Sequence, residues 1–208
     1  QHLQVLQRVV RHNVRNDVNK LVGWTKMLAA ESDADRREKC LYRLLRIFDS
    51  WERIADKMQV IDRAIREIPH DESTVDIETV VEEAAAAVHE RHPDATVTVS
   101  IDATDEAVSQ WLTHPLTEAV ANAAAAGDRS DPSVDVSVRR VDDGWLQILV
   151  ADDGPGMPDM EREVLVTGEE TPLRHGSGLG IWLIRMLISV LGGEIDVDAQ
   201  GRIQVQFH

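Results

Sequence analysis

"VADDGPGMP" at residues 150–158 and "HGSGLG" at residues 175–180 decide the fold of the C-terminal part of this chain. The first motif follows a run in which apolar and polar residues alternate, which predicts a strand ending near Asp152. The second precedes the apolar run "IWLIRMLISVL", which predicts a helix. Glycines at the start of a helix let backbone N–H groups approach a phosphate, and the helix dipole favours the anion. Each motif is weak alone, because "DDGPG" is also favourable turn chemistry.

A third stretch, "LTEAVANAAAAG" at residues 116–127, carries Glu118 and Asn122 one helical turn apart and therefore on one face. The amide oxygen of Asn122 suits the oxygen-only shell that Mg²⁺ prefers. Asp152, at the predicted strand end, can accept a hydrogen bond from an adenine amine. An alanine-rich core helix with two incidental polar residues is the other interpretation of this stretch. The three elements in this order favour a nucleotide site.

The first 68 residues are built differently, because none of the seven prolines and only one of the twelve glycines, Gly23, precedes residue 69. Apolar residues recur there in steps of three and four, from Leu3 to Leu28 and from Leu41 to Ile65, which predicts two long helices. The polar turn "ESDADRRE" joins them, with Asp33 or Asp35 as the predicted N-cap of the second helix. One hairpin leaves an apolar stripe uncovered, so two hairpins are expected to pair as a four-helix bundle in a homodimer.

After the linker "EIPHDEST", at residues 67–74, the period changes. Alternating runs predict strands at 97–101, 134–138, 146–150 and 203–207, and helical patterns fall at about 77–90, 112–126 and 178–191. Strands interleaved with helices that cover one face give a two-layer α/β sandwich. The predicted fold class is therefore α+β, with a helical hairpin at 1–68 and an α/β sandwich at 69–208.

The charge is distributed unevenly along the chain. Residues 1–70 hold 14 Lys and Arg against 10 Asp and Glu, a net of +4, whereas residues 71–208 hold 8 against 27, a net of −19. Such an acidic domain repels phosphate backbones, which excludes non-specific nucleic-acid binding, and it suits a protein that stays soluble in high salt. The single Cys40 excludes a disulfide framework. The apolar run at 181–191 is short and contains Arg185, so it predicts a core helix and no membrane span.

"RVVRHNVRNDVNKL" at residues 8–21 places His12 among polar and basic side chains, between the apolar positions of the first predicted helix. His12 is therefore expected on the outside of the bundle. A surface histidine on a solvated helix face is the simplest interpretation of this stretch by itself.

The order of Asn122, "DDGPG" and "GSGLG" resembles the nucleotide-binding fold shared by sensor histidine kinases, the gyrase and mismatch-repair ATPases and the ninety-kilodalton heat-shock ATPase. The hairpin with His12 is similar to the dimerisation and phosphoacceptor domain of the histidine kinases alone. "RHNVRND" and "EREVLVTGEETPLRHGSGLGIWLI" look especially like sensor kinases of salt-loving archaea. The resemblance covers nearly the whole chain.

The resemblance implies that the C-terminal domain binds ATP with Mg²⁺ and that His12 accepts the γ-phosphate. Asn122 would hold the metal and Asp152 the adenine, while residues 157–175 would form a mobile lid. The implied catalytic residues are His12, Asn13, Asn16 and Glu118, and the implied nucleotide-binding residues are Asn122, Asp152, Gly154, Gly156, Gly176, Ser177, Gly178, Leu179 and Gly180.

This chain departs from the family pattern beside the histidine and near the phosphates. An acidic residue commonly follows the phosphoacceptor, but here Asn13 does, so we expect Asn13 to orient His12 without acting as its base. Asp17, Glu118 or a lid glutamate remain open as the base. Ala125 and Ala126 replace residues that are usually polar, and the lid has no phenylalanine.

The resemblance also implies partners, namely a homodimer and a response-regulator receiver domain, and it implies a cytoplasmic location. Because the chain begins within a helical pattern, a sensor domain is expected N-terminal to it. Two rival functions remain. The protein can be a nucleotide-binding regulatory dimer or a response-regulator phosphatase, with Asn16 orienting a water, or it can hydrolyse ATP as the gyrase-type relatives do, with Glu118 as general base.

Overall fold

The computed structural model describes residues 2–103, 105–126, 131–141, 144–167, 178–198 and 200–207, and for residues 2–13, 160, 167, 178 and 179 it describes the helical backbone only. The chain divides into two compact units. One contains residues 1–59, and the other contains residues 60–171 and 180–208. Each unit is described separately below.

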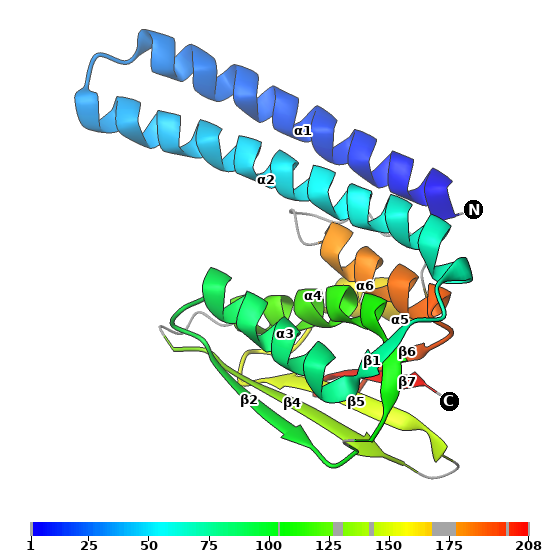
Figure 1. The fold of residues 1–208 in the computed structure, drawn as a ribbon. Coiled ribbons are helices and arrows are strands. Elements are labelled where there is room, and N and C mark those ends of the chain that lie inside the picture. The colour runs from blue at the N-terminus through cyan, green and yellow to red at the C-terminus, as the bar shows by residue number, and fades with distance from the viewer. Residues whose placement is uncertain are drawn as a thin grey trace. The chain divides into compact units, whose positions relative to one another are not determined.

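Two helices form the N-terminal unit, α1 (His2–Ala30) and the greater part of α2 (Ala34–Glu67), as Figure 1 shows. Asp33 caps α2, because its Oδ1 accepts a hydrogen bond from the Arg36 amide at 3.0 Å, which confirms the predicted cap. Farther along the hairpin, the indole N–H of Trp51 donates to Asp17 Oδ2 at 3.2 Å and so ties the two helices together.

The apolar stripes of the hairpin are only partly covered within one chain. Cys40 and Leu44 are buried. Leu41 and Phe48, which belong to the predicted apolar stripe of α2, are 48% and 49% exposed within the single chain. Val18, Val22 and Leu45 are exposed as well. Two helices can bury only one stripe on each other, and the other apolar stripe stays open.

The C-terminal unit holds a five-stranded sheet of order β2-β4-β5-β7-β6. β2 and β4 are parallel, and the other neighbouring strands are antiparallel. The strands are β2 (Thr96–Ile101), β4 (Ser133–Arg140), β5 (Leu146–Asp152), β6 (Glu194–Val197) and β7 (Ile203–Phe207). A separate antiparallel pair is formed by β1 (Thr74–Asp76) and β3 (Ala107–Ser109).

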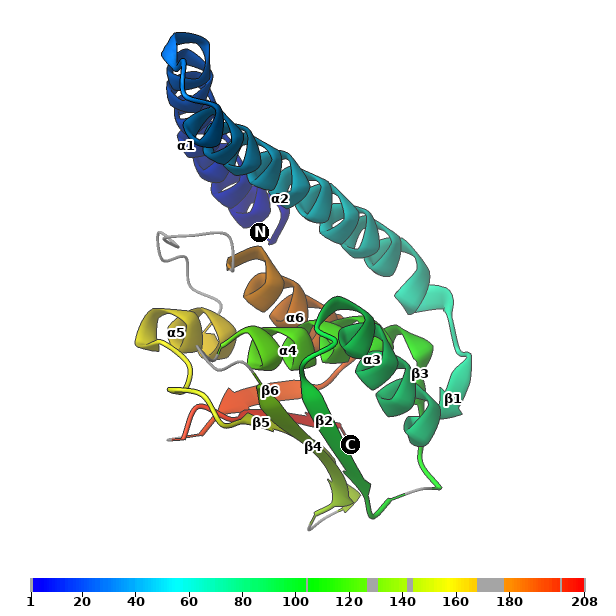
Figure 2. The same cartoon turned by 90° about the vertical axis from the view of Figure 1, so that its left-hand side faces the viewer.

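Helices α3 (Ile77–Arg91), α4 (Thr113–Ala125) and α6 (Gly178–Val190) lie over one face of this sheet, as Figure 2 shows. The remaining helical elements are α5 (Asp159–Thr167), η1 (Ile68–His70) and η2 (Gln110–Leu112). α6 is apolar on nearly all sides, since Ile181, Leu183 and Met186, which point in different directions around the helix, are at most 4% exposed, as suits a helix inside a core. The two-layer α/β sandwich is therefore confirmed. The sequence patterns did not predict β1, β3, β6 or α5, which are short.

Among the residues that the structure describes, no helix has the length and apolar character needed to cross a membrane.

Candidate functional site

A pocket of the C-terminal unit brings two of the predicted nucleotide-binding side chains together. Asn122 comes from the last turn of α4, and Asp152 is the last residue of β5. The other lining residues are Ala123, Ala126, Val150, Gly156, Met157, Pro158, Glu161, Ile181, Gly201 and Ile203. Sequence reasoning therefore found the floor of the pocket. Pro158 and Glu161, which it assigned to the lid, form a wall of the pocket at the start of α5.

The side-chain amide of Asn122 has an unsatisfied hydrogen-bond donor in the described part of the chain. Its Nδ2 is buried, and within the described part of the chain it has no hydrogen-bond partner. A buried donor left without a partner costs about 1–3 kcal/mol, so native structures seldom retain one without a reason. Turned over, the same amide presents its oxygen. The residue therefore fits a ligand that supplies a phosphate oxygen or a hard cation.

Asp152 is half-buried, and its Oδ1 accepts a hydrogen bond from the Gly154 amide at 2.8 Å. A Cβ at position 154 would lie 2.7 Å from that oxygen, so Gly154 permits the turn. The carboxylate is thus held in place through one oxygen, and the geometry leaves its other oxygen able to accept a hydrogen bond from a ligand.

At the pocket, the backbones of Gly156 and Gly201 lie close to each other, and both residues have a φ of +83°. A Cβ at Gly201 would lie 2.6 Å from the Met157 amide nitrogen and 2.9 Å from Gly156 Cα. Asp198 shapes the turn before β7, since its Oδ1 accepts from the amides of Gln200 and Arg202. Burial alone would raise the pKa of Asp198, but the hydrogen bonds from Arg202 and Gln200 outweigh it and hold this pKa below its ordinary value of 3.8. Gly201 was missed because a lone glycine before a strand carries no motif.

The structure describes the other predicted site residues of the C-terminal unit only in part. Glu118 lies one turn before Asn122 on α4 and is 9% exposed. Gly180 is buried in the first turn of α6, and the backbone of Gly178 and Leu179 begins that helix. Gly176, Ser177 and residues 168–175 of the predicted lid lie outside the described residues. The first part of that lid, residues 157–167, is described and contains α5.

The predicted phosphoacceptor residues lie on α1, in the other unit. The backbone of His12 and Asn13 is helical, and their side chains fall outside the described part of the structure. Asn16 is exposed on the same helix. Asp17 accepts from Lys20 Nζ at 3.0 Å through Oδ1 and from Trp51 through Oδ2, so both of its oxygens are engaged.

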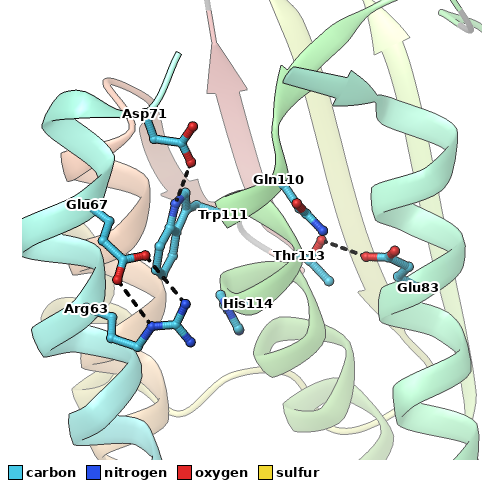
Figure 3. Close-up of a pocket in the computed structure, with 8 residues that line it drawn as sticks. All are labelled: Arg63, Glu67, Asp71, Glu83, Gln110, Trp111, Thr113 and His114. Atoms are coloured by element: carbon cyan, nitrogen blue, oxygen red, sulfur yellow. Dashed lines mark hydrogen bonds and ion pairs between the residues drawn. The ribbon is translucent and has the colours of Figure 1, made fainter. Parts of the chain in front are cut away.

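A second cavity of the C-terminal unit, of about 310 Å³, lies where the end of α2 meets α3 and α4. Figure 3 shows Arg63 and Glu67 on one wall and Glu83 on the other, with Trp111 and His114 between them. The Arg63 guanidinium carbon lies 5.5 Å from the centre of the Trp111 ring, within the range of a cation–π interaction. The last turns of α2, which belong to the C-terminal unit, therefore pack against η2 and α4 of the same unit.

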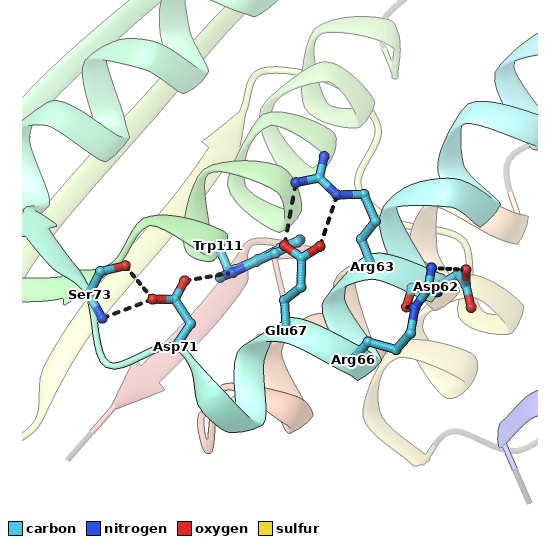
Figure 4. A network of polar contacts seen from close by, with 7 residues as sticks. All are labelled: Asp62, Arg63, Arg66, Glu67, Asp71, Ser73 and Trp111. Atoms are coloured by element: carbon cyan, nitrogen blue, oxygen red, sulfur yellow. Dashed lines mark hydrogen bonds and ion pairs between the residues drawn. The ribbon is translucent and has the colours of Figure 1, made fainter.

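Polar contacts around Trp111 extend this attachment, as Figure 4 shows. The Trp111 indole donates to Asp71 Oδ2 at 3.2 Å, and hydrogen bonds from the Ser73 hydroxyl and amide lower the pKa of Asp71. His114 lies against Trp111, with ring centres 5.6 Å apart. Burial lowers the pKa of His114 below 6.5, and the Arg63 charge adds to this effect. A neutral His114 therefore suits a site that already holds one cation.

Comparison with known proteins identifies the fold of the C-terminal unit. Residues 107–208 match the family described as "Histidine kinase-, DNA gyrase B-, and HSP90-like ATPase". The structure is similar to that of the histidine kinase AdeS of Acinetobacter baumannii, with a TM-score of 0.66, 16% identity, and coverage of 94% of this chain and 96% of that one. The order of a helical region and an α/β sandwich is thus shared across nearly both chains.

Two curated relatives resemble the chain along most of its length. The sensor histidine kinase ZraS of Klebsiella oxytoca is 24% identical over 91% of this chain and 42% of its own length. The sensory histidine kinase/phosphatase NtrB of Rhizobium meliloti is 25% identical over 94% of this chain and 55% of its own length. The chain thus spans about half the length of these relatives. Together with the family match, they support a histidine kinase core.

Proposed function

We propose that this histidine kinase core binds ATP in the C-terminal unit and transfers the γ-phosphate to His12. The proposal rests on Asn122, which shares a pocket with Asp152 and whose buried Nδ2 has no hydrogen-bond partner among the described residues. The pocket needs a ligand with both a polar group for the amide and a hydrogen-bond donor for the carboxylate. A nucleotide offers both, through its phosphates and its adenine amine.

Mg²⁺ fits the same place. The C-terminal domain carries a net charge of −19 over residues 71–208, so a bare triphosphate would meet repulsion there. Asn122 would hold a divalent cation through its amide oxygen, and the cation would neutralise part of that charge. High salt would screen the remaining repulsion, so we expect nucleotide affinity to be retained in molar salt.

The transfer itself joins a ring nitrogen of His12 to the γ-phosphorus. The bond from that phosphorus to the bridging oxygen breaks, and ADP leaves with the electron pair. The other ring nitrogen keeps its proton, and Asn13 is proposed to hold that proton and so the ring orientation. Asp17 is a poor candidate for the base because Lys20 and Trp51 already occupy both of its oxygens. We assign it instead to fixing α1 against α2.

The partners follow from the same proposal. The exposed apolar side chains Val18, Val22, Leu41, Leu45 and Phe48 offer a second hairpin the surface that closes a four-helix bundle. The phosphoryl group on His12 would then pass to an aspartate of a response-regulator receiver domain. We place the core in the cytoplasm, next to a sensor domain, and relate its acidity to a high-salt cell interior.

Incubation with γ-labelled ATP in molar salt tests this function. The expected result is acid-labile label on the protein, absent in His12→Gln. Label that persists in His12→Gln would show that another residue is the acceptor. Rapid release of free phosphate without protein label would favour an ATPase that uses Glu118.

A phosphatase activity toward the response regulator is the second candidate, and the name of the relative NtrB favours it. Asn16 is exposed on α1 and has an amide able to orient a water molecule. Dephosphorylation of a labelled receiver domain, compared between the unsubstituted protein and Asn16→Ala, tests it. Equal rates would remove Asn16 from that role.

A further inference from the structure

Arg185 is the only charged residue in the sequence of α6, "GLGIWLIRMLISV". Arg185 itself is half-buried, whereas its neighbours Ile184 and Met186 are 0% and 4% exposed, so its side chain lies at the edge of the core of the C-terminal unit. A half-buried guanidinium loses part of its hydration, so its N–H donors are expected to have protein partners.

The partners of Arg185 are backbone carbonyls at the end of another helix. Its Nη1 donates to the Leu165 oxygen at 2.6 Å and also to the Val166 oxygen. Both belong to the last turn of α5, where carbonyls have no partner within their own helix. A positive charge at a helix C-terminus is also favoured by the helix dipole. The last turn of α5 has no basic residue of its own, so Arg185 supplies this charge from α6.

α5 depends on such contacts because it has only nine residues. Helices of that length are marginal in water and require tertiary packing. Val164 and Leu165 pack into the core at 3% and 0% exposure, and Arg185 holds the adjacent carbonyls. At the opposite end, Pro158 and Glu161 form the wall of the pocket that contains Asn122. A short helix thus has one end tied to α6 and the other at the pocket.

We propose that Arg185 is a positioning residue of the nucleotide site, which acts by fixing α5 so that its first turn stands ready as a pocket wall. This inference rests on the proposed function only in naming the ligand a nucleotide. Arg185 makes no contact with the ligand in this role. Because Arg185 already orders α5 in the free protein, less conformational entropy is lost when the nucleotide binds, and binding is stronger.

The test compares Arg185→Gln and Arg185→Lys with the unsubstituted 208-residue chain in molar salt. Two quantities are measured, the dissociation constant of ADP by calorimetry and amide hydrogen exchange across residues 159–167. Arg185→Gln is expected to speed exchange in α5 and to weaken ADP binding about tenfold, equivalent to about 1.4 kcal/mol. Arg185→Lys keeps a cation that can reach a carbonyl and is expected to recover part of both effects.

Arg139→Gln is the matched control, because Arg139 also makes a part-buried hydrogen bond, donating to Gln147 Oε1 at 2.7 Å, but on the sheet. It should change thermal stability without changing ADP affinity. Unchanged exchange in α5 of Arg185→Gln, or an ADP affinity that falls no more than in Arg139→Gln, would overturn the proposal. If Arg185→Gln does not fold, Arg185→Lys alone decides by the same two measurements. If the unsubstituted chain binds no ADP, the proposed function and the nucleotide role fall together, while the exchange comparison still decides whether Arg185 holds α5.

Discussion

Gly201→Ala should damage the nucleotide pocket through the backbone alone. Gly201 has φ of +83°, and a Cβ there would lie 2.6 Å from the Met157 amide nitrogen and 2.9 Å from Gly156 Cα. Neither neighbour can rotate away, because both are main-chain atoms. Gly144 is a matched control in the same unit, because its φ is +84° and a Cβ there would meet no atom within 4 Å.

Both substitutions place an alanine in the left-handed backbone region, but only Gly201→Ala also crowds neighbouring atoms. A non-glycine residue in the left-handed region costs about 1–2 kcal/mol, and this applies to both. Crowding by an added carbon costs about 1–3 kcal/mol more, and this applies only to Gly201→Ala. We therefore expect Gly144→Ala to lose about 1–2 kcal/mol of unfolding free energy and Gly201→Ala to lose about 2–5 kcal/mol.

Urea unfolding in molar salt measures the free energies, and the transition that ADP shifts to higher urea identifies the C-terminal unit. Calorimetry measures ADP affinity for both variants. Gly201→Ala should weaken ADP binding, because the displaced Gly156–Met157 turn lines the pocket, while Gly144→Ala should leave it unchanged. Equal losses in the two variants would refute the close approach, and unchanged ADP affinity in Gly201→Ala would refute its place at the site.

Three further predictions concern single side chains. Asn122→Ala should abolish ATP binding while the dimer, measured by light scattering, stays intact; unchanged affinity would mean that the site is misplaced. Asn13→Asp should raise the initial rate of His12 phosphorylation, because a general base is worth ~10²–10⁴-fold, and Asn13→Ala should lower it modestly. If Asn13→Asp were as inactive as His12→Gln, the orienting role would be wrong. His114 has a pKa below 6.5 in the folded chain, so unfolding takes up a proton at mildly acidic pH, and stability should decline as the pH falls below about 6.5. His114→Gln should remove this part of the decline between pH 7.5 and 5.5, and an unchanged profile would contradict the assignment.

Local sequence patterns determined most of the helices and strands of this protein and several of its candidate site residues. The periods of two and of three to four residues located the long helices and the longer strands, because each pattern reports which side of an element is buried. Asp33 and Asp35 were the two predicted caps, because capping depends on neighbouring residues, and the structure selects Asp33. The order of the motifs predicted that Asn122 and Asp152 belong to one site, and the two residues line the same pocket in the structure.

Other features were decided only by contacts between distant parts of the chain. Gly201 meets Gly156 across about 45 residues, and Arg185 meets the end of α5 across about 20, so no local pattern indicates either contact. The short elements β1, β3, β6 and α5 also escaped prediction, since a few residues are stabilised by their neighbours in space and not by their own period. Likewise, the period of α2 predicts an apolar stripe along the whole helix, but tertiary packing decides that Cys40 and Leu44 are covered within one chain while Leu41 and Phe48 stay exposed. The periodicity shows which apolar residues gain stability from burial, and only the three-dimensional arrangement decides which other residues cover them.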